Sequence, residues 1–343
     1  MMPSTFVYVG NAESQSVSIF SLSLDGALAA IDTQAVPGPA KPGSTTPMAV
    51  SPDKRFLLVG LRNEPYSAAT FSIDPSTGKL SFVGSGPLAD AMAYIATDRS
   101  GRFLLSASYG GGKIAVNPIG ANGVVGPAQQ VIAGQPNAHA VIAGRANRHV
   151  LYTSLGNDIV GQLVFDAATG TLTPNDPPAI SVKPKAGPRH FRFSPDERFV
   201  YLLCELDASI YVFPYFVANG RLSKETQVAS ALPPGFAGKP WAADLHLTAD
   251  GEFLYASERA SSTLAAFRID AKSGALTPIA SYPTETQPRG FAIDPSGRTL
   301  LAVGQLSDSL TAYAIDLDSG ALRALKRYPV GKNPNWIEIV SLP

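Results

Sequence analysis

Short runs of alternating bulky and polar residues, separated by tight turns, recur along the chain. In FRFSPDERFVYLL, residues 191–203, two such runs flank the turn Ser194-Pro195-Asp196. Alternation with a period of two predicts β-strands, and a Ser-Pro-Asp sequence is typical of a tight turn. The pattern therefore predicts a protein built from many short strands.

Two markers repeat along the chain with a common spacing. The first is a glycine in a polar turn followed shortly by an apolar residue, as in DAATGTL, and it occurs at Gly26, Gly78, Gly123, Gly170, Gly220, Gly274 and Gly320. The intervals between these glycines are 52, 45, 47, 50, 54 and 46 residues. The second marker is the turn before a bulky strand, with anchor residues at Arg55, Arg102, Arg148, Arg198, Glu252 and Arg298. Each repeat has room for four short strands.

Seven repeats of this kind are typical of a β-propeller, in which radial repetition leaves only short, protected sheet edges. The first repeat lacks its opening strand, because the chain begins directly at FVYVG. The C-terminal segment NWIEIV resembles the openings of the other repeats. We therefore predict an all-β, seven-bladed β-propeller with four antiparallel strands per blade. It forms a single domain over 1–343, and a strand at 334–340 completes blade one and closes the ring.

The repeats also predict where polar side chains meet. In an antiparallel blade, the start of the first strand lies beside the end of the second, so these positions share one face near the central channel. Nine residues before the anchors stand Thr46, Ala93, His139, Arg189, Ala243 and Arg289, which we call the first ring. Seven residues after the anchors stand Arg62, Tyr109, Leu155, Glu205, Arg259 and Gln305, the second ring. Convergent polar groups at a concave mouth predict a binding site.

Residues outside the rings are expected to contribute less directly. His190 and Asp244 occupy matching offsets in neighbouring blades, which predicts a hydrogen bond between them. His190 and His246 are out of phase with the first ring, which favours packing between blades. The long connections 35–47 and 231–241, the second ending at Trp241, are expected on the face of the two rings, where one of them could wall a pocket.

The charged residues of the rings have a purely structural alternative. Arg189, Glu205 and Arg259 could form a buried ion-pair network between blades, and Arg62 could make only a rim salt bridge. We favour a functional site because Arg289 and His139 share the face, and three guanidiniums exceed what one carboxylate needs.

Composition narrows the partners. The chain has 27 basic and 27 acidic residues, so its formal net charge offers no field for nucleic acid or an anionic membrane. No run approaches the roughly 20 apolar residues of a membrane span, and the start MMPSTFVYVGN lacks the features of a secretory signal. The single Cys204 fits a reducing cytoplasm. We expect a cytoplasmic monomer or weak oligomer.

Metal chemistry is not expected. The four histidines are scattered, and no His, Asp or Glu cluster has ligand spacing. We therefore expect neither a metal nor a cofactor.

Four segments carry a resemblance to a known family. SPDKRFLLVG, AGPRHFRFSPDERFVYLLCEL, WAADLHLTADGEFLYASER and, above all, TETQPRGFAIDPSGR resemble the seven-bladed propeller type of 6-phosphogluconolactonase, a family that includes fungal carboxymuconate-lactonising enzymes. The resemblance extends from FVYVGN to NPNWIEIV. It implies metal-independent hydrolysis of a sugar-acid lactone. The active-site residues proposed for the muconate-lactonising relatives correspond to His139 in PNAHAVI, Arg189 in GPRH, Glu205 in CEL and Arg259 in SER.

We therefore predict a lactonase with Glu205, His139, Arg189 and Arg259 as catalytic residues. Glu205 or His139 could act as the base, and the sequence does not choose between them. Arg189 and Arg259 would bind substrate oxygens and transition-state charge. The predicted substrate-binding residues are Arg289, which would hold a terminal anionic group, and Gln305, His190, Arg62, Asp244 and Trp241.

The leading substrate is 6-phosphogluconolactone, in the pentose phosphate pathway. The alternatives are an unphosphorylated glucaro- or galactarolactone, a muconate cycloisomerisation, and a non-enzymatic scaffold. Fold alone does not decide among them.

Overall fold

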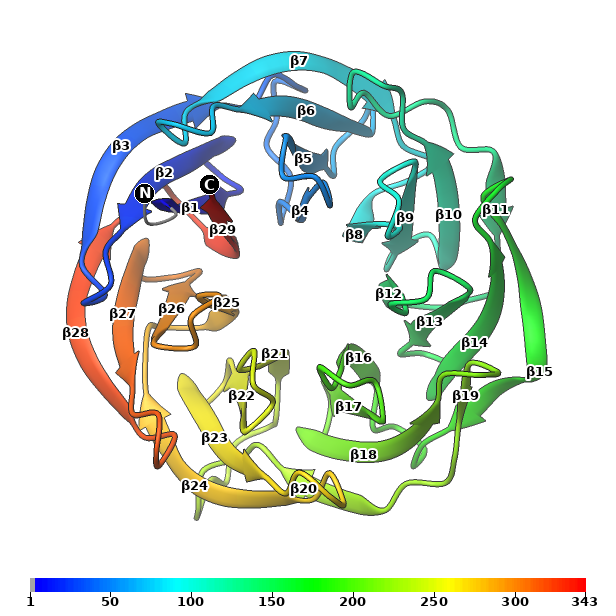
Figure 1. Ribbon diagram of the computed structural model, residues 1–343, viewed down its shortest axis with the longest axis vertical. Helices are drawn as coiled ribbons and strands as arrows, with labels where there is room; N and C mark the ends of the chain where they lie inside the picture. Colours follow the sequence, from blue (N-terminus) through cyan, green and yellow to red (C-terminus); the bar gives the residue numbers. More distant parts are fainter. Residues whose placement is uncertain (1–3) are drawn as a thin grey trace.

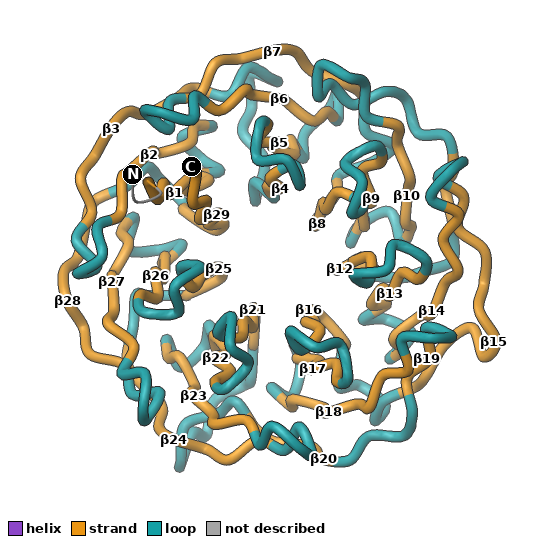
Figure 2. The backbone as a smooth tube through the Cα atoms, viewed as in Figure 1, coloured by secondary structure: helices purple, strands orange, loops and turns teal. Residues whose placement is uncertain are grey.

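Seven β-sheets are arranged radially in a ring around a central axis (Figure 1). The computed structural model describes residues 4–343, and this part of the chain contains strands, turns and loops but no helix (Figure 2). None of its segments is therefore a helix that could cross a membrane. The predicted architecture is confirmed.

Each blade runs from an inner strand at the channel to an outer strand at the rim. The inner strands are β29 (Pro334–Leu342), β4 (Met48–Val50), β8 (Met92–Thr97), β12 (Ala138–Ala143), β16 (Pro188–Phe193), β21 (Ala242–Leu247) and β25 (Pro288–Ile293). The second strands are β1 (Ser4–Asn11), β5 (Phe56–Leu61), β9 (Phe103–Ser108), β13 (His149–Ser154), β17 (Phe199–Cys204), β22 (Phe253–Glu258) and β26 (Thr299–Gly304).

The two outer layers complete the blades. The third strands are β2 (Ser16–Leu22), β6 (Ser67–Ile73), β10 (Lys113–Pro118), β14 (Ile159–Asp166), β18 (Ser209–Phe216), β23 (Thr263–Ile269) and β27 (Ser309–Ile315). The outer strands are β3 (Leu28–Ala35), β7 (Leu80–Pro87), β11 (Gln130–Ile132), β15 (Thr171–Ser181), β24 (Leu276–Pro283) and β28 (Leu322–Pro329). In the blade of β16 the outer strand is split into β19 (Arg221–Leu222) and β20 (Gln227–Ser230), which both pair with β18.

The C-terminal strand closes the ring as predicted. β29 pairs antiparallel with β1, with Phe6 opposite Val340 and Tyr8 opposite Glu338. The two ends of the chain therefore lie in one blade (Figure 1). The strand continues to Leu342, two residues beyond its predicted end.

The repeated glycine has a packing reason. Gly78 has a positive φ of 69°, and a Cβ there would meet the Phe6 ring of the neighbouring blade at 2.2 Å. Gly220 has the same φ, and the ring of His149 covers it at 2.2 Å. Only glycine combines a left-handed backbone with this close approach. The repeated glycine thus marks a position where neighbouring blades touch. His149 takes part in one of these contacts.

Candidate active site

A β-bulge lies at the first-ring residue of five inner strands, and a similar bulge lies in β29. In β16, Pro188 pairs with Cys204 and His190 with Leu203, so Arg189 has no partner residue. The same shift skips His139 in β12 and Arg289 in β25. It also occurs at β8, β21 and the pairing of β29 with β1. Bulges re-aim side chains, so the residue after each first-ring position can also face the channel.

The second ring stands at the ends of the second strands. Glu205 follows β17 directly, Arg259 follows β22 and Arg62 follows β5. These positions place them beside the bulges of the first ring. The strand ends of several blades thus build one polar cluster, as the repeats predict.

Glu205 is bound by two arginines. Nε of Arg189 and Nη2 of Arg259 lie 2.8 and 3.0 Å from Oε2 of Glu205. All three residues are buried. Burial by itself opposes ionisation of Glu205, but the positive charges of Arg189 and Arg259 outweigh it and lower its pKa. Glu205 is therefore an ionised carboxylate shared between two blades.

Backbone carbonyls hold the two guanidiniums in place. Arg189 Nη1 donates to the carbonyl of Ala243, while Arg259 donates from Nε to Trp241 O and from Nη2 to Ala242 O, each at 3.0 Å. The Arg259 guanidinium lies 3.9 Å from the centre of the Trp241 ring, a cation–π contact. Burial lowers the Arg259 pKa to about 9. The loop 231–241 therefore reaches the cluster through Trp241, as expected.

Two further arginines add uncompensated charge. The Arg289 side chain makes no ion pair or hydrogen bond with any other residue between positions 4 and 343. Burial lowers its pKa well below the usual value, and the charges of Arg189, Arg259 and Arg62 lower it further. Arg62 donates from Nη1 to Thr45 Oγ1 at 2.6 Å. The cluster thus has more guanidinium charge than Glu205 neutralises, which suits an anionic ligand.

His139 faces this cluster as a neutral imidazole. Burial lowers its pKa well below the usual value, and Arg189 adds to the effect. Its ring centre lies 4.9 Å from that of His190 and 5.9 Å from that of Tyr109. Its Nδ1 is buried and has no hydrogen-bond partner within residues 4–343.

The predicted bond between His190 and Asp244 is present. His190 Nδ1 lies 2.7 Å from Asp244 Oδ1, and His246 Nε2 lies 3.0 Å from Asp244 Oδ2. The bond joins β16 to β21, so it does link neighbouring blades. His246 packs between blades as expected, since its ring centre lies 4.8 Å from that of Phe291 in the next blade, and it also lines the channel. The bulge in β21 shifts the phase of that strand.

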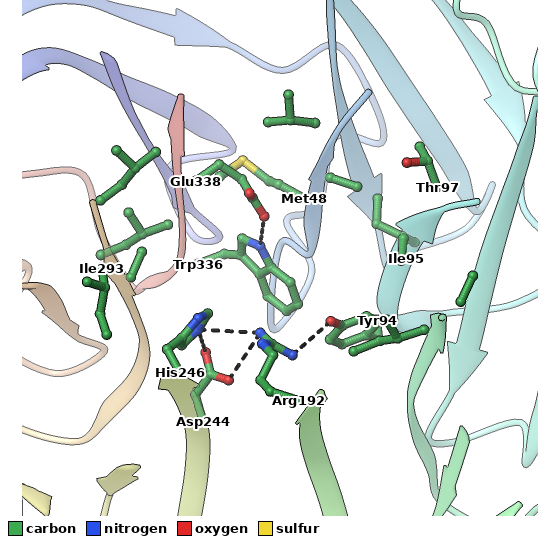
Figure 3. Close-up of a pocket in the computed structure, with 18 of the residues that line it drawn as sticks. Met48, Tyr94, Ile95, Thr97, Arg192, Asp244, His246, Ile293, Trp336 and Glu338 are labelled. Carbon is green, nitrogen blue, oxygen red and sulfur yellow. Dashed lines mark hydrogen bonds and ion pairs between the residues drawn. The ribbon is translucent and has the colours of Figure 1, made fainter. Parts of the chain in front are cut away.

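A cavity of about 330 Å³ lies next to Asp244 and His246, between the inner strands (Figure 3). Its polar wall contains Asp244 and His246 together with Tyr94, Arg192, Trp336 and Glu338. Arg192 Nη1 donates to the Tyr94 hydroxyl at 3.2 Å, and Trp336 Nε1 donates to Glu338 at 2.8 Å (Figure 3). Of the predicted site residues, all of which fall within 4–343, Asp244 alone lines this cavity.

Sequence reasoning missed four residues of the cavity wall: Tyr94, Arg192, Trp336 and Glu338. Alternation along the inner strands carries a usable signal, because residues two apart share a face of a strand. Stepping two residues from His190 and Trp336 gives Arg192 and Glu338. Gln305 accepts a hydrogen bond from Gln287 at 3.1 Å and donates one to Asn333 at 2.9 Å, and its predicted role in substrate binding stays a prediction.

No group of three or more His, Cys, Asp or Glu side chains among residues 4–343 has an arrangement that could hold a metal ion.

Comparison with known proteins gives concordant matches over nearly the whole chain. The family described as "Lactonase, 7-bladed beta-propeller" matches residues 6–339. The 6-phosphogluconolactonase of Pectobacterium carotovorum subsp. carotovorum (strain PC1) is 39% identical over 336 residues, which cover 98% of each chain. That of Photorhabdus laumondii is also 39% identical, over 98% of this chain and 99% of its own.

Among solved structures, the periplasmic gluconolactonase of Pseudomonas aeruginosa superposes with a TM-score of 0.90. It is 30% identical, and the superposition covers 99% of this chain and 100% of that one.

Proposed function

The chain belongs to the lactonase family of seven-bladed β-propellers, and from this membership we propose that it hydrolyses 6-phosphogluconolactone to 6-phosphogluconate. The enzyme class is lactonase, since relatives named 6-phosphogluconolactonase match it over 98% of its length. The reaction belongs to the pentose phosphate pathway.

The excess of positive charge at the mouth of the channel is the observation that supports a phosphorylated substrate. Arg289 and Arg62 have no carboxylate bonded to them within residues 4–343, while Glu205 is shared by Arg189 and Arg259. A phosphate dianion offers several acceptor oxygens to forked guanidinium donors. We assign Arg289, with Arg62 beside it, to the phosphate of the substrate.

The remaining residues of the cluster suit the hydrolytic steps. Lactone hydrolysis needs an attacking water, stabilisation of the oxyanion that forms at the carbonyl, and a proton for the departing ring oxygen. Arg189 and Arg259 provide fixed donors for the oxyanion, and Glu205 holds them in position. His139 is a neutral imidazole that can hydrogen-bond the water. Trp241, about 40% exposed beside Arg259, offers an apolar face to the sugar carbons.

An unphosphorylated gluconolactone is the second candidate substrate. The supporting observation is the full-length likeness, at 30% identity, to the periplasmic gluconolactonase of Pseudomonas aeruginosa. In that case Arg289 would bind a carboxylate or hydroxyl group instead of a phosphate. The cytoplasmic location that we propose would also need revision, and cell fractionation tests it.

A paired assay separates the two candidates. One arm uses freshly generated 6-phosphogluconolactone, the other gluconolactone with glucaro- and galactarolactone, and each is corrected for spontaneous opening. We expect kcat/KM to favour the phosphorylated lactone by about 100-fold, which corresponds to about 2.7 kcal/mol of transition-state binding. A preference for the unphosphorylated lactones would overturn the choice of substrate while keeping the lactonase activity.

A further inference from the structure

Three buried nitrogen atoms without partners belong to neighbouring side chains where the mouth meets the channel. They are Nη2 of Arg189, Nδ1 of His139 and Nε2 of His190, and none has a hydrogen-bond partner within residues 4–343. Arg189 and His190 are consecutive residues at the bulge of β16, and the rings of His139 and His190 are 4.9 Å apart. Buried polar atoms are normally hydrogen-bonded to protein or to ordered water. These three nitrogens are therefore free to bind a small polar molecule.

The partners of His190 settle where its proton lies. Asp244 is ionised, since its two histidine neighbours more than offset the effect of burial and keep its pKa well below the usual value. Burial lowers the pKa of His190 to about 3, so the ring is neutral and carries one proton. An ionised carboxylate 2.7 Å from Nδ1 accepts that proton in a hydrogen bond. Nε2 of His190 consequently keeps its lone pair.

Asp244 is itself held in a fixed orientation. The backbone amide of Leu245 donates to its Oδ1 at 2.9 Å, and His246 contacts its Oδ2 at 3.0 Å. The carboxylate therefore cannot rotate away from His190 without losing these bonds. This is the arrangement in which a carboxylate fixes the tautomer of a histidine that acts as a base.

Glu205 is less available to a water molecule. Its Oε2 already accepts bonds from Arg189 and Arg259, whereas Nε2 of His190 has no partner within residues 4–343. A carboxylate held in this way is suited to positioning the guanidiniums rather than to removing a proton from water.

We propose that the three nitrogens bind the attacking water, and that His190 is the general base of the hydrolysis, with Asp244 as its positioning residue. The inference rests on the lactonase activity proposed above. As the water oxygen bonds to the lactone carbonyl carbon, one water proton moves to Nε2 of His190, and the carbonyl electron pair moves to the oxygen beside Arg189 and Arg259. When the ring C–O bond breaks, the same proton passes from His190 to the departing alkoxide, which gives the hydroxy acid.

The test combines turnover with the tautomer of the histidine. We expect His190→Gln to lower kcat at least 100-fold, within the usual range of about 10²–10⁴ for an acid–base group, with KM changed less than about threefold. Asp244→Ala should lower kcat comparably. Asp244→Asn should recover about tenfold of that loss, because the Leu245 amide keeps the side-chain oxygen at the Oδ1 position, where it still accepts a hydrogen bond from Nδ1 of His190. His149→Gln, which removes a histidine from a contact between blades far from the site, is the control.

A spectroscopic readout separates positioning from general damage to the fold. ¹⁵N NMR of labelled histidines should show His190 as the Nδ1–H tautomer in the wild type and in Asp244→Asn, and a mixture in Asp244→Ala. An Nε2–H tautomer in the wild type would overturn the inference even if a variant failed to fold. So would a kcat of His190→Gln within threefold of the wild type. Absence of turnover of any lactone by the wild type would instead overturn the proposed function, and the tautomer result would stand apart from it.

Discussion

Nε of Arg189 lies 2.8 Å from Oε2 of Glu205, with both side chains almost completely removed from solvent. The arginine stands at the bulge of β16 and the glutamate directly follows β17, so two neighbouring strands of one blade present the pair to the channel. Arg259 brings a second guanidinium to the same oxygen from the next blade. The stability of the ring and the charge of the site therefore depend on one carboxylate.

Glu205→Gln should destabilise the protein as well as reduce its activity. Loss of the negative charge leaves two buried guanidiniums without a counterion, and removal of one partner from a buried pair typically costs about 3–5 kcal/mol. The amide oxygen remains as an acceptor, so we expect the free energy of unfolding to fall by about 2–4 kcal/mol in urea titrations. Asp196→Asn, which breaks the exposed pair with Arg198, should change it by less than about 1 kcal/mol. Equal effects of the two substitutions would contradict this account.

The same carboxylate predicts that the folded protein loses stability in acid. The folded protein lowers the Glu205 pKa from its ordinary value of 4.5, so the unfolded chain takes up this proton at a higher pH than the folded one. The contribution of Glu205 is therefore complete above about pH 4.5 and is lost as pH falls through the lower folded pKa. We expect the difference in unfolding free energy between wild type and Glu205→Gln to be constant from pH 5 to 8 and to shrink below pH 4.5. A difference that grows on acidification would have the wrong sign.

The repeat spacing predicted the two rings because strand ends recur at fixed distances from each anchor. Arg189, Glu205 and Arg259 came together as expected, without any information on their contacts. The bulges were not predictable in the same way, because a bulge depends on how two strands pair rather than on the residues of one strand. His246 packs between blades as predicted, and the repeat spacing did not indicate that it also lines the channel.

The C-terminal strand shows a second limit of the repeat pattern. Trp336 and Glu338 lie on β29, whose partner β1 is more than 300 residues away in sequence. Neither repeated marker therefore indicates which residues of β29 face the channel. Gln305 stands at its predicted ring position, where its amide hydrogen-bonds Gln287 and Asn333. Its role in substrate binding stays a prediction.

Arg289 should discriminate between phosphorylated and unphosphorylated lactones. It has no anionic partner within residues 4–343, so its guanidinium is available to a substrate phosphate. A hydrogen bond to a charged group typically contributes about 1.5–3 kcal/mol, or roughly 10- to 100-fold. We expect Arg289→Gln to lower kcat/KM for 6-phosphogluconolactone by that factor and to leave kcat/KM for gluconolactone within about threefold.

Arg289→Lys is the matched variant, because it keeps the charge but loses the fork. It should recover part of the activity toward the phosphorylated lactone. If Arg289→Gln lowered kcat/KM equally for both lactones, Arg289 would serve the reacting carbonyl instead of the phosphate.

Glu338 predicts a dependence of stability on pH that has the opposite sign to that of Glu205. Burial raises the pKa of Glu338 to about 7 from an ordinary value of 4.5, although Trp336 donates a hydrogen bond to it. Between these values the folded protein holds a proton that the unfolded chain has released. The free energy of unfolding therefore falls as pH rises from about 4.5 to 7.

The substitution Glu338→Gln tests this effect, because the amide carries no charge at any of these pH values and keeps an acceptor for Trp336. In urea titrations, we expect the unfolding free energy of the variant minus that of the wild type to increase by about 2 kcal/mol between pH 5 and pH 8. Substitution of the exposed Glu13 by Gln is the control. A flat difference for Glu338→Gln would show that Glu338 is ionised throughout, in contact with Arg192 or with water in the cavity.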